Sequence, residues 1–319
     1  MSSRYAGPVP LRYTYLGPEG TFSEQALRTL PEVADAAVTA ARSVPEALDA
    51  VRVGEADAAL VPLENSVGGA VAVTLDELAS GAPLMITREV VLPVQFVLGA
   101  RAGVELEQLG TIAAHPQAAA QCRNWLRKNA PGATVVEVLS NAAAAVGAAT
   151  GEYDAGICAP IGADRHGLTL LGRNIADHAD AVTRFALVSR PATPAPPTGD
   201  DVTSLVVFIA QNRVGALLQV LTEFALRGVN LTRIESRPTG ERLGRYLFFF
   251  DCEGHVAEAR LGEALMGLHR VSADVRFLGS YPRARLDNSV GRAEFAPGTT
   301  DADYAEATGW LSRLRAGDL

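Results

Sequence analysis

A proline-rich segment limits how this chain can fold. Residues 190–201 read RPATPAPPTGDD and contain four prolines and one glycine. Proline fixes φ and has no backbone N–H, so this segment cannot continue a helix or a central strand. It is expected to form an extended, semi-rigid spacer. The segment therefore predicts two folded regions, one over residues 11–190 and a compact one over residues 203–282, followed by a tail.

The first region alternates short apolar runs with helical patterns. A helix bearing Cys122 and Trp125 is expected to stop at Pro131, and Asn141 is placed to cap an alanine-rich helix. Such alternation is typical of a mainly parallel sheet with helices on both faces, so the expected fold class is α/β. The strand candidates are residues 13–16, 58–63, 90–98, 111–114 and 155–159.

The second region shows the order β-α-β-β-α-β. Its strand candidates are residues 205–210, 231–236, 246–250 and 275–278, and its helical patterns cover residues 214–225 and 255–268. This order predicts a ferredoxin-like split βαβ fold. In the tail, an apolar stripe is expected to form a short helix that docks on the body. The stripe consists of Tyr304, Ala307, Leu311 and Leu314.

The composition argues against several classes of protein. Hydrophobic residues make up 48% of the chain, which is too many for a mostly disordered protein. The net charge of −8 and the lack of a basic run argue against nucleic acid or an anionic membrane surface as a partner. No apolar stretch approaches the roughly 20 residues that span a bilayer, and no signal-peptide pattern is present. The separated cysteines Cys122, Cys158 and Cys252 indicate buried thiols in a reducing cytoplasm.

Two strand-to-helix junctions carry polar residues that suit an anionic ligand. In GPEGTFSEQAL, Thr21 and Glu24 have capping-box spacing, and a helix start offers free N–H groups to an anion. In PLENSVGG, the side chains of Glu64, Asn65 and Ser66 follow an apolar strand, where α/β sheets bind ligands. The alternatives are an ordinary capped turn at Thr21, and an Asn or Ser helix cap beside a solvated glutamate.

Two further stretches could face the same cleft. His115 and Gln117 flank a proline at another strand-to-helix junction, where the imidazole could donate to an anion. The alternative there is a packed or exposed turn histidine. Thr183, Arg184 and Phe185 begin an apolar run, and Arg184 could pair bidentately with a carboxylate, although the triplet alone also fits an ordinary strand start. No histidines or cysteines have the spacing of metal ligands.

Two stretches of the second region are candidates for a small-molecule or oligomer interface. One joins the first strand to the first helix, where Gly215 permits close approach. The other ends the second strand, where Pro238 should terminate the ladder. Ordinary loop chemistry is the alternative for both. The candidate residues are Asn212, Gly215, Ala216, Leu217, Glu235, Ser236, Arg237 and Pro238.

The ordered set of motifs resembles the prephenate dehydratase family. GPEGTFSE, PLENS, HPQ, TRF, GAL and ESRP occur in this order between Tyr13 and Pro282. The resemblance implies a two-lobed, periplasmic-binding-protein-like catalytic domain followed by a ferredoxin-like ACT regulatory domain. One departure is Ala181, which stands where family members commonly have asparagine. The implied boundaries are 11–190 for the catalytic domain (lobes 11–88 with 173–190, and 89–172), 203–282 for the ACT domain and 283–319 for the tail.

The resemblance implies a lyase that converts prephenate to phenylpyruvate with loss of CO₂ and water. Aromatisation drives the reaction, so no metal or redox cofactor is required. Thr183 would hydrogen-bond the leaving hydroxyl, Arg184 would orient the substrate, and Phe185 would shape the pocket. Glu64 and His115 both remain open as the proton donor. The residues that would bind the dianionic substrate are Thr21, Glu64, Asn65, Ser66, His115 and Gln117.

The resemblance also implies regulation. Phenylalanine bound between ACT domains near residues 215–217 and 235–238 would favour a less active arrangement, which requires different affinities for two states. ACT domains generally pair, so a homodimer or homotetramer is expected. Arogenate dehydratase is an alternative function on the same fold, and a non-enzymatic amino-acid sensor is a second one. The expected location is the cytoplasm.

Overall fold

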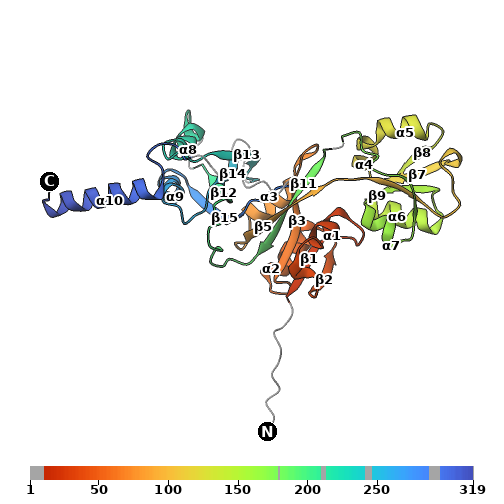
Figure 1. The fold of residues 1–319 in the computed structure, drawn as a ribbon, viewed down its shortest axis with the longest axis horizontal. Coiled ribbons are helices and arrows are strands. Elements are labelled where there is room, and N and C mark those ends of the chain that lie inside the picture. Colours follow the sequence, from red (N-terminus) through yellow and green to blue (C-terminus); the bar gives the residue numbers. More distant parts are fainter. Residues whose placement is uncertain (1–10, 179, 210–212, 241–245, 287–294, 319) are drawn as a thin grey trace, which may run out of the picture. The chain divides into compact units, whose positions relative to one another are not determined.

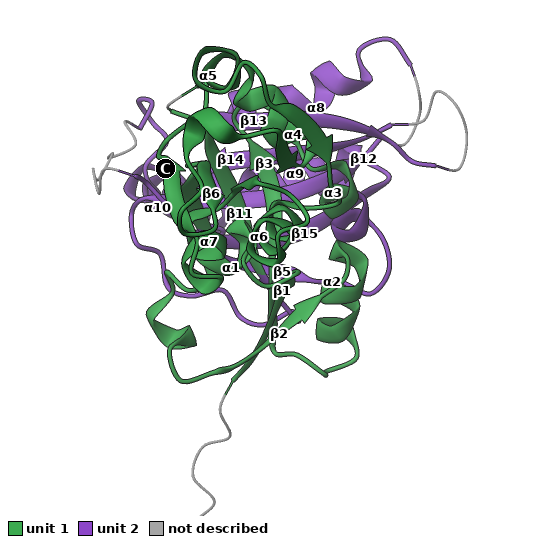
Figure 2. Cartoon of the chain, turned by 90° about the vertical axis from the view of Figure 1, so that its right-hand side faces the viewer, with its two compact units in different colours: residues 1–75, 90–187 green, residues 76–89, 188–319 purple. Residues whose placement is uncertain are grey.

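The structure is a computed structural model, and two compact units make up the chain. Unit 1 contains residues 1–75 and 90–187, and unit 2 contains residues 76–89 and 188–319 (Figure 2). Residues 76–89 therefore belong to unit 2, although they lie in the first region of the sequence and precede the proline-rich segment. The structure describes residues 11–178, 180–209, 213–240, 246–286 and 295–318.

The first sheet has the strand order β2-β1-β3-β11-β5, and β4 pairs with β3 (Figure 1). Strand β1 is parallel to both of its neighbours. Tyr15, Leu60 and Phe185 contribute to its buried core. The elements are β1 (Arg12–Leu16), α1 (Phe22–Leu27), a 3₁₀ turn (Pro31–Val33), β2 (Ala37–Ala41), α2 (Val44–Arg52), β3 (Ala58–Asn65), β4 (Gly69–Ala70), α3 (Ala72–Ala79), β5 (Met85–Pro93) and β11 (Val182–Ser189).

The second sheet has the order β10-β6-β9-β7-β8. Strand β7 is parallel to β8 and β9, whereas β6 is antiparallel to β9 and β10. The expectation of a mainly parallel sheet is therefore wrong for this second sheet, because β6 and β10 run against the parallel strands. The elements are β6 (Val97–Ala100), a 3₁₀ turn (Leu106–Gln108), β7 (Thr111–Ala114), α4 (Pro116–Gln121), α5 (Arg123–Asn129), β8 (Thr134–Glu137), α6 (Asn141–Thr150), β9 (Ala155–Cys158), α7 (Pro160–Arg165) and β10 (Thr169–Gly172).

Three local expectations for the first region are wrong. The third expected strand is two strands, since β5 ends at Pro93, which has no N–H for the ladder, and β6 begins afterwards. The helix expected around Cys122 is split into α4 and α5, because Cys122 has φ −110° and ψ 8°. Ser140 rather than Asn141 caps α6, and its Oγ accepts the Ala143 N–H at 3.0 Å.

Helix α6 packs closely on β9 because both surfaces are built from small residues. Ala144, Ala145 and Ala148 of the helix are fully buried. A Cβ placed on Gly156 of β9 would lie 2.3 Å from the backbone oxygen of Ala144. The glycine is therefore required by the close approach of two backbones.

The third sheet belongs to unit 2 and is antiparallel throughout, in the order β13-β14-β12-β15. Phe224 of α8 and Leu268 of α9 pack in its core with Leu205 and Phe250. The expected β-α-β-β-α-β order is confirmed, and β13 ends at Pro238 as expected. The elements are β12 (Asp201–Phe208), α8 (Ala216–Ala225), β13 (Leu231–Pro238), β14 (Tyr246–Glu253), α9 (Ala259–Val271) and β15 (Asp274–Pro282).

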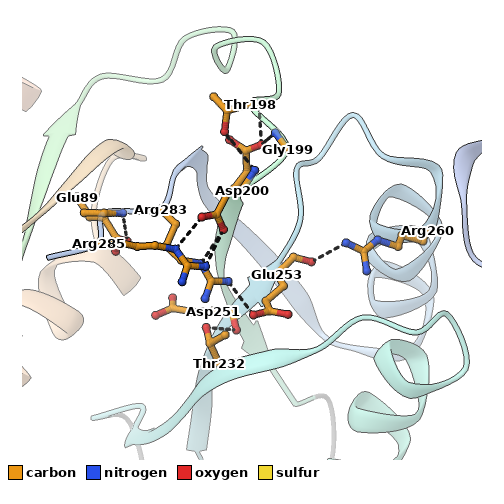
Figure 3. Close-up of polar contacts among 12 residues, drawn as sticks. Glu89, Thr198, Gly199, Asp200, Thr232, Asp251, Glu253, Arg260, Arg283 and Arg285 are labelled. Carbon is orange, nitrogen blue, oxygen red and sulfur yellow. Dashed lines mark hydrogen bonds and ion pairs between the residues drawn. The ribbon is translucent and has the colours of Figure 1, made fainter. Parts of the chain in front are cut away.

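The proline-rich segment ends in a group of ion pairs (Figure 3). The carboxylate of Asp200 lies 2.8 Å from Arg285 Nε and 3.3 Å from Arg283 Nε. Arg283 also reaches Glu253 at the end of β14, with 2.9 Å between Nη2 and Oε1. The end of the spacer is thus fixed to the segment that follows β15, and Arg283 links this segment to the end of β14.

The tail contains a 16-residue helix, α10 (Asp301–Ala316), which begins with a capping box between Thr300 and Asp303. Its first residue is held by the body, since the Ala259 N–H donates to Asp301 at 2.8 Å. The apolar stripe expected to dock on the body is only partly covered, since Tyr304 and Leu314 are half-buried and Ala307 and Leu311 are exposed. No residue of α10 is buried, and Leu311 is 39% exposed.

Candidate functional site

Asn65 and Thr183 are 118 residues apart in the sequence and meet where β3 ends and β11 begins. Asn65 Nδ2 donates to Thr183 Oγ1 at 2.9 Å. Asn65 Oδ1 accepts the N–H groups of Val67 and Gly68 at 2.9 and 2.8 Å, so the amide cannot turn round without losing both bonds. Thr183 is therefore the acceptor of the bond from Asn65, and its hydroxyl keeps its own proton for another acceptor.

The hairpin after Asn65 is bound to β11. Ser66 Oγ accepts the Val182 N–H at 3.0 Å, and the Ser66 N–H donates to the Val182 oxygen at 2.9 Å. The interpretation of PLENSVGG as a helix start is wrong, because the chain turns back here to form β4. Glu64 Oε2 lies 3.7 Å from Arg184 Nη2. The structure thus brings the predicted Glu-Asn-Ser stretch together with the start of β11.

Phe185 and Ala181 are buried residues on either side of this pair. Phe185 packs in the core of the first sheet with Tyr15. Ala181 lies in the core cluster of the second sheet. Ala181 offers no side-chain hydrogen bond to Thr183, and the Thr183 hydroxyl receives one from Asn65.

The start of α1 is capped by residues of its own chain. Thr21 Oγ1 donates to the Pro18 oxygen at 3.0 Å and accepts the Glu24 N–H at 3.5 Å. The Glu24 carboxylate accepts the Gly20 N–H at 2.6 Å. Thr21 therefore caps the helix as expected, but the Glu24 carboxylate binds the Gly20 N–H and not the Thr21 N–H that a capping box would use. The negative charge at this helix start comes from Glu24 itself.

Glu24 also joins the two sheets of unit 1, a link that the sequence pattern did not indicate because the partner lies 141 residues away. Its side chain is 1% exposed and lies 2.5 Å from Arg165 Nη2 at the end of α7 and 2.7 Å from Arg28 Nη2. Arg165 pairs with Glu19 as well. Burial alone would raise the pKa of Glu24, but the Gly20 N–H and the two guanidinium groups outweigh it and hold the pKa below its usual range.

Glu24→Gln is expected to lower the free energy of unfolding at neutral pH by about 1.5–3 kcal/mol, the range for hydrogen bonds to charged groups. Folding lowers the pKa of Glu24, so its stabilising effect is present above the ordinary glutamate pKa of about 4.3 and is lost as the pH falls through the lower folded-state value. The difference between variant and wild type should therefore shrink in acid. Denaturant unfolding of both proteins from neutral to acid pH measures it.

Glu46→Gln is the matched control for this variant. Glu46 has the same arrangement at the start of α2, with Ser43 as the cap and the Arg42 N–H donating at 2.9 Å, but its side chain is 42% exposed. A much smaller change is expected because solvent screens the charge. Equal losses in the two variants would contradict the role assigned to burial.

His115 and Gln117 lie at the junction of β7 and α4. His115 Nδ1 accepts the Gln117 N–H at 3.3 Å and so caps α4. In a neutral imidazole this bond places the proton on Nε2, which can act as a donor. Among the residues that the structure describes, no hydrogen bond or ion pair joins either residue to Thr183.

The residues expected around Gly215 lie at the start of α8, and Asn212 lies outside the described residues. Gly215 has φ +81°, a left-handed conformation that favours glycine, and it precedes Ala216. No atom of the described residues lies within 4 Å of a Cβ placed on Gly215. Leu217 packs against the core of the third sheet. The backbone at Gly215 is therefore open to a close approach.

Strand β13, an edge strand of the third sheet, ends with Glu235, Ser236, Arg237 and Pro238. The side chains alternate, with Glu235 and Arg237 half-buried and the other two exposed. Arg237 forms a bidentate pair with Asp76 of α3, with Nε–Oδ1 and Nη2–Oδ2 distances of 3.0 and 2.7 Å. Its guanidinium is thus held in one orientation.

The described part of the chain has no group of three or more His, Cys, Asp or Glu side chains that could hold a metal ion. None of the helices within it is long and apolar enough to cross a membrane. Cys122, Cys158 and Cys252 are buried and form no disulfide, as expected. Burial raises the pKa of Cys122 and Cys158 to about 12, so these thiols stay protonated.

Comparison with known proteins identifies the family. The sequence profile of prephenate dehydratase matches residues 13–193, and the profile of the ACT domain matches residues 203–269. The chain belongs to the prephenate dehydratase family. A prephenate dehydratase from Amycolatopsis methanolica is 49% identical over 308 residues, which cover 96% of this chain and 99% of the relative.

Solved structures agree with this assignment. The crystal structure of a prephenate dehydratase from Arthrobacter aurescens in complex with L-Phe aligns with a TM-score of 0.90 and 48% identity, over 96% of this chain and 100% of that one. GqqA, described as a quorum quenching acylase, aligns with a TM-score of 0.77 and 29% identity, over 87% of this chain and 100% of that one. The expected family is confirmed, as is the two-lobed, periplasmic-binding-protein-like fold with an ACT domain.

Proposed function

We propose that this chain catalyses the decarboxylating dehydration of prephenate to phenylpyruvate. The observation that carries the proposal is the Thr183 hydroxyl, which accepts a bond from a fixed Asn65 amide and keeps its proton for a substrate oxygen. The 49% identity to a protein named prephenate dehydratase, over nearly the whole chain, supports the same activity. Identity to the acylase GqqA is 29%, which favours the dehydratase.

In the proposed reaction the bond to the ring carboxylate and the bond to the ring hydroxyl both break. The electron pair of the first bond enters the ring as CO₂ departs, and the hydroxyl takes a proton and leaves as water. Negative charge develops on the leaving oxygen, and Thr183 donates a hydrogen bond to it. A donor placed where charge develops lowers the barrier to the reaction.

Arg184 is assigned to substrate orientation. Interactions that are equally strong in the ground state and the transition state do not raise kcat, so tight binding of the departing carboxylate would not help. Arg184 therefore suits the pyruvyl carboxylate, which the product retains. The proposed substrate-binding set is Thr21, Glu64, Asn65, Ser66, His115 and Gln117, and Phe185, which packs in the core of the first sheet, is proposed to shape the pocket.

The proton for the departing hydroxyl is proposed to come from Glu64 or His115. Glu64 lies beside Arg184, and His115 carries a proton on Nε2 when neutral. Glu24 does not suit this role, because its buried carboxylate is already bound by the Gly20 N–H and by the guanidinium groups of Arg28 and Arg165.

L-Phenylalanine is the proposed effector, bound at the ACT domain. The relative from Arthrobacter aurescens binds L-Phe, and the residues assigned to the effector site here are Asn212, 215–217 and 235–238. Pairing of ACT domains would give a homodimer or homotetramer in the cytoplasm. The proposed boundaries remain 11–190, 203–282 and 283–319.

Incubation of the purified chain with prephenate at neutral pH is expected to yield phenylpyruvate, and phenylalanine is expected to reduce the rate. Prephenate breaks down spontaneously in acid, so a reaction without enzyme is the control. Turnover of arogenate alone would make the chain an arogenate dehydratase. Turnover of neither substrate, with phenylalanine still bound, would contradict the proposed enzyme and favour an amino-acid sensor.

A further inference from the structure

Helix α3 belongs to both compact units. Its residues 72–75 lie in unit 1, and its residues 76–79 lie in unit 2 (Figure 2). Within unit 1, Thr74 is fully buried, and its hydroxyl donates to the Pro62 oxygen of β3 at 2.6 Å. The first half of α3 is thus fixed to the strand that ends in Glu64 and Asn65.

The second half of α3 is held by two arginines of the third sheet. Arg237 of β13 forms the bidentate pair with Asp76. Arg276 of β15 donates from Nη1 to the Ser80 oxygen at 2.9 Å and to the Leu78 oxygen at 3.3 Å, where a helix end leaves carbonyls without partners. A bidentate pair fixes orientation as well as distance, so the position of α3 follows that of β13.

The hairpin that supports Thr183 leads directly into α3. Asn65 ends β3, the chain turns back through β4, and α3 begins at Ala72. The Val71 N–H donates to the Leu63 oxygen at 3.0 Å, which ties this connection to β3. A displacement of α3 therefore reaches Asn65 through a short, hydrogen-bonded segment, and Asn65 sets the orientation of the Thr183 hydroxyl.

We propose that the ion pair between Arg237 and Asp76 couples effector binding at β13 to the Thr183 hydroxyl. This inference rests on the proposed function, in which phenylalanine binds beside residues 235–238. An effector that favours one position of β13 also favours one position of α3, and with it one geometry of Asn65. By linkage, the substrate then changes effector affinity by the same factor. Asp76 is a positioning residue, since it touches neither ligand.

The pair suits a test by substitution because its loss should not unfold the chain. The side chains of Arg237 and Asp76 are 26% and 52% exposed. Ion pairs this exposed contribute little to the free energy of unfolding. Asp76→Asn removes the charge and keeps the size of the side chain, so a change in inhibition can be assigned to the ion pair and not to altered packing.

Inhibition of full-length Asp76→Asn by L-phenylalanine is the test. The concentration for half-inhibition is expected to rise about fivefold, the lower end of the range for an allosteric coupling and close to the most that an exposed ion pair can transmit. The rate without phenylalanine, and the affinity for phenylalanine measured by calorimetry, are expected to stay near wild type. Asp49→Asn is the matched control, because it removes an exposed ion pair of 2.7 Å with Arg52 on α2 and should be inhibited normally.

Several outcomes would overturn the coupling. Normal inhibition of Asp76→Asn by phenylalanine, together with an active wild type, would refute the coupling and leave the proposed function intact. Loss of phenylalanine binding would also overturn it, because Asp76 would then belong to the effector site. If Asp76→Asn does not fold, Asp76→Ala removes the same carboxylate from the pair, and normal inhibition of that variant is equally fatal. A wild type that does not turn over prephenate would refute the proposed function and the coupling together.

Discussion

Thr183→Ala is expected to lower kcat for prephenate about 10²–10³-fold, the loss found when a donor to developing negative charge is removed. KM should change little, because the hydrogen bond strengthens only as the bond to the leaving oxygen breaks. The expectation follows from the 2.9 Å bond from Asn65, which leaves the proton of the hydroxyl to the substrate. Initial rates of phenylpyruvate formation over a range of prephenate concentrations give both constants.

Two further variants distinguish the effect of the Thr183 hydroxyl on kcat from the effect of other changes in β11. Thr183→Ser keeps the hydroxyl and should retain most of kcat. Ser189→Ala removes a hydroxyl from the other end of β11, where it donates to the Arg190 oxygen at 2.9 Å, and should behave as wild type. A kcat for Thr183→Ala close to that of Ser189→Ala would show that the hydroxyl does not assist the leaving group.

Gly156→Ala is expected to destabilise unit 1 by about 3 kcal/mol, the upper end of the range for overpacking. The added Cβ would lie 2.3 Å from the Ala144 oxygen, and this oxygen belongs to the backbone of α6 and cannot rotate away. A loss of this size lowers the melting temperature by roughly 6–12 °C in a unit of this size. Thermal unfolding followed by circular dichroism or calorimetry measures the shift.

Gly132→Ala is the matched control for the glycine at β9. Gly132 lies in the turn before β8, and no heavy atom of the described residues lies within 4 Å of a Cβ placed there. Its substitution should change the melting temperature little, because nothing has to move. Equal melting temperatures for the two variants would mean that α6 and β9 do not pack as closely as the structure has them.

Local patterns in the sequence predict most of the strands and the order of the ACT fold. The run at 111–114 is found as β7 with the same bounds, and β13 ends at Pro238 as expected. Both results depend on short-range physics, since apolar runs form strands and proline interrupts a hydrogen-bonded ladder. The same physics keeps residues 190–200 out of regular strands, since β11 ends at Ser189 and β12 begins at Asp201.

The contacts that build the site are not local, and the sequence alone does not predict them. Asn65 was a candidate binding residue, but its bond to Thr183 spans 118 residues and needs β3 and β11 to be neighbours. The turn after Asn65 was expected to begin a helix, because an asparagine side chain can satisfy either a helix start or a tight turn. The partner strand decides between them, since Val182 binds Ser66 in the hairpin form.

The division into two compact units differs from the division that the proline-rich segment predicts. Residues 76–89 precede the prolines, yet they belong to unit 2, where Leu84, Met85 and Ile86 are buried. A catalytic fragment cut at the prolines would lose partners of this segment, among them Gly279 of β15, where a Cβ would lie 2.1 Å from the Ile86 oxygen, and Ala284, whose N–H donates to Glu89 at 2.8 Å. The regulatory domain is therefore not an interchangeable module. A chain engineered to carry a different effector domain must also provide a surface on which residues 76–89 can pack.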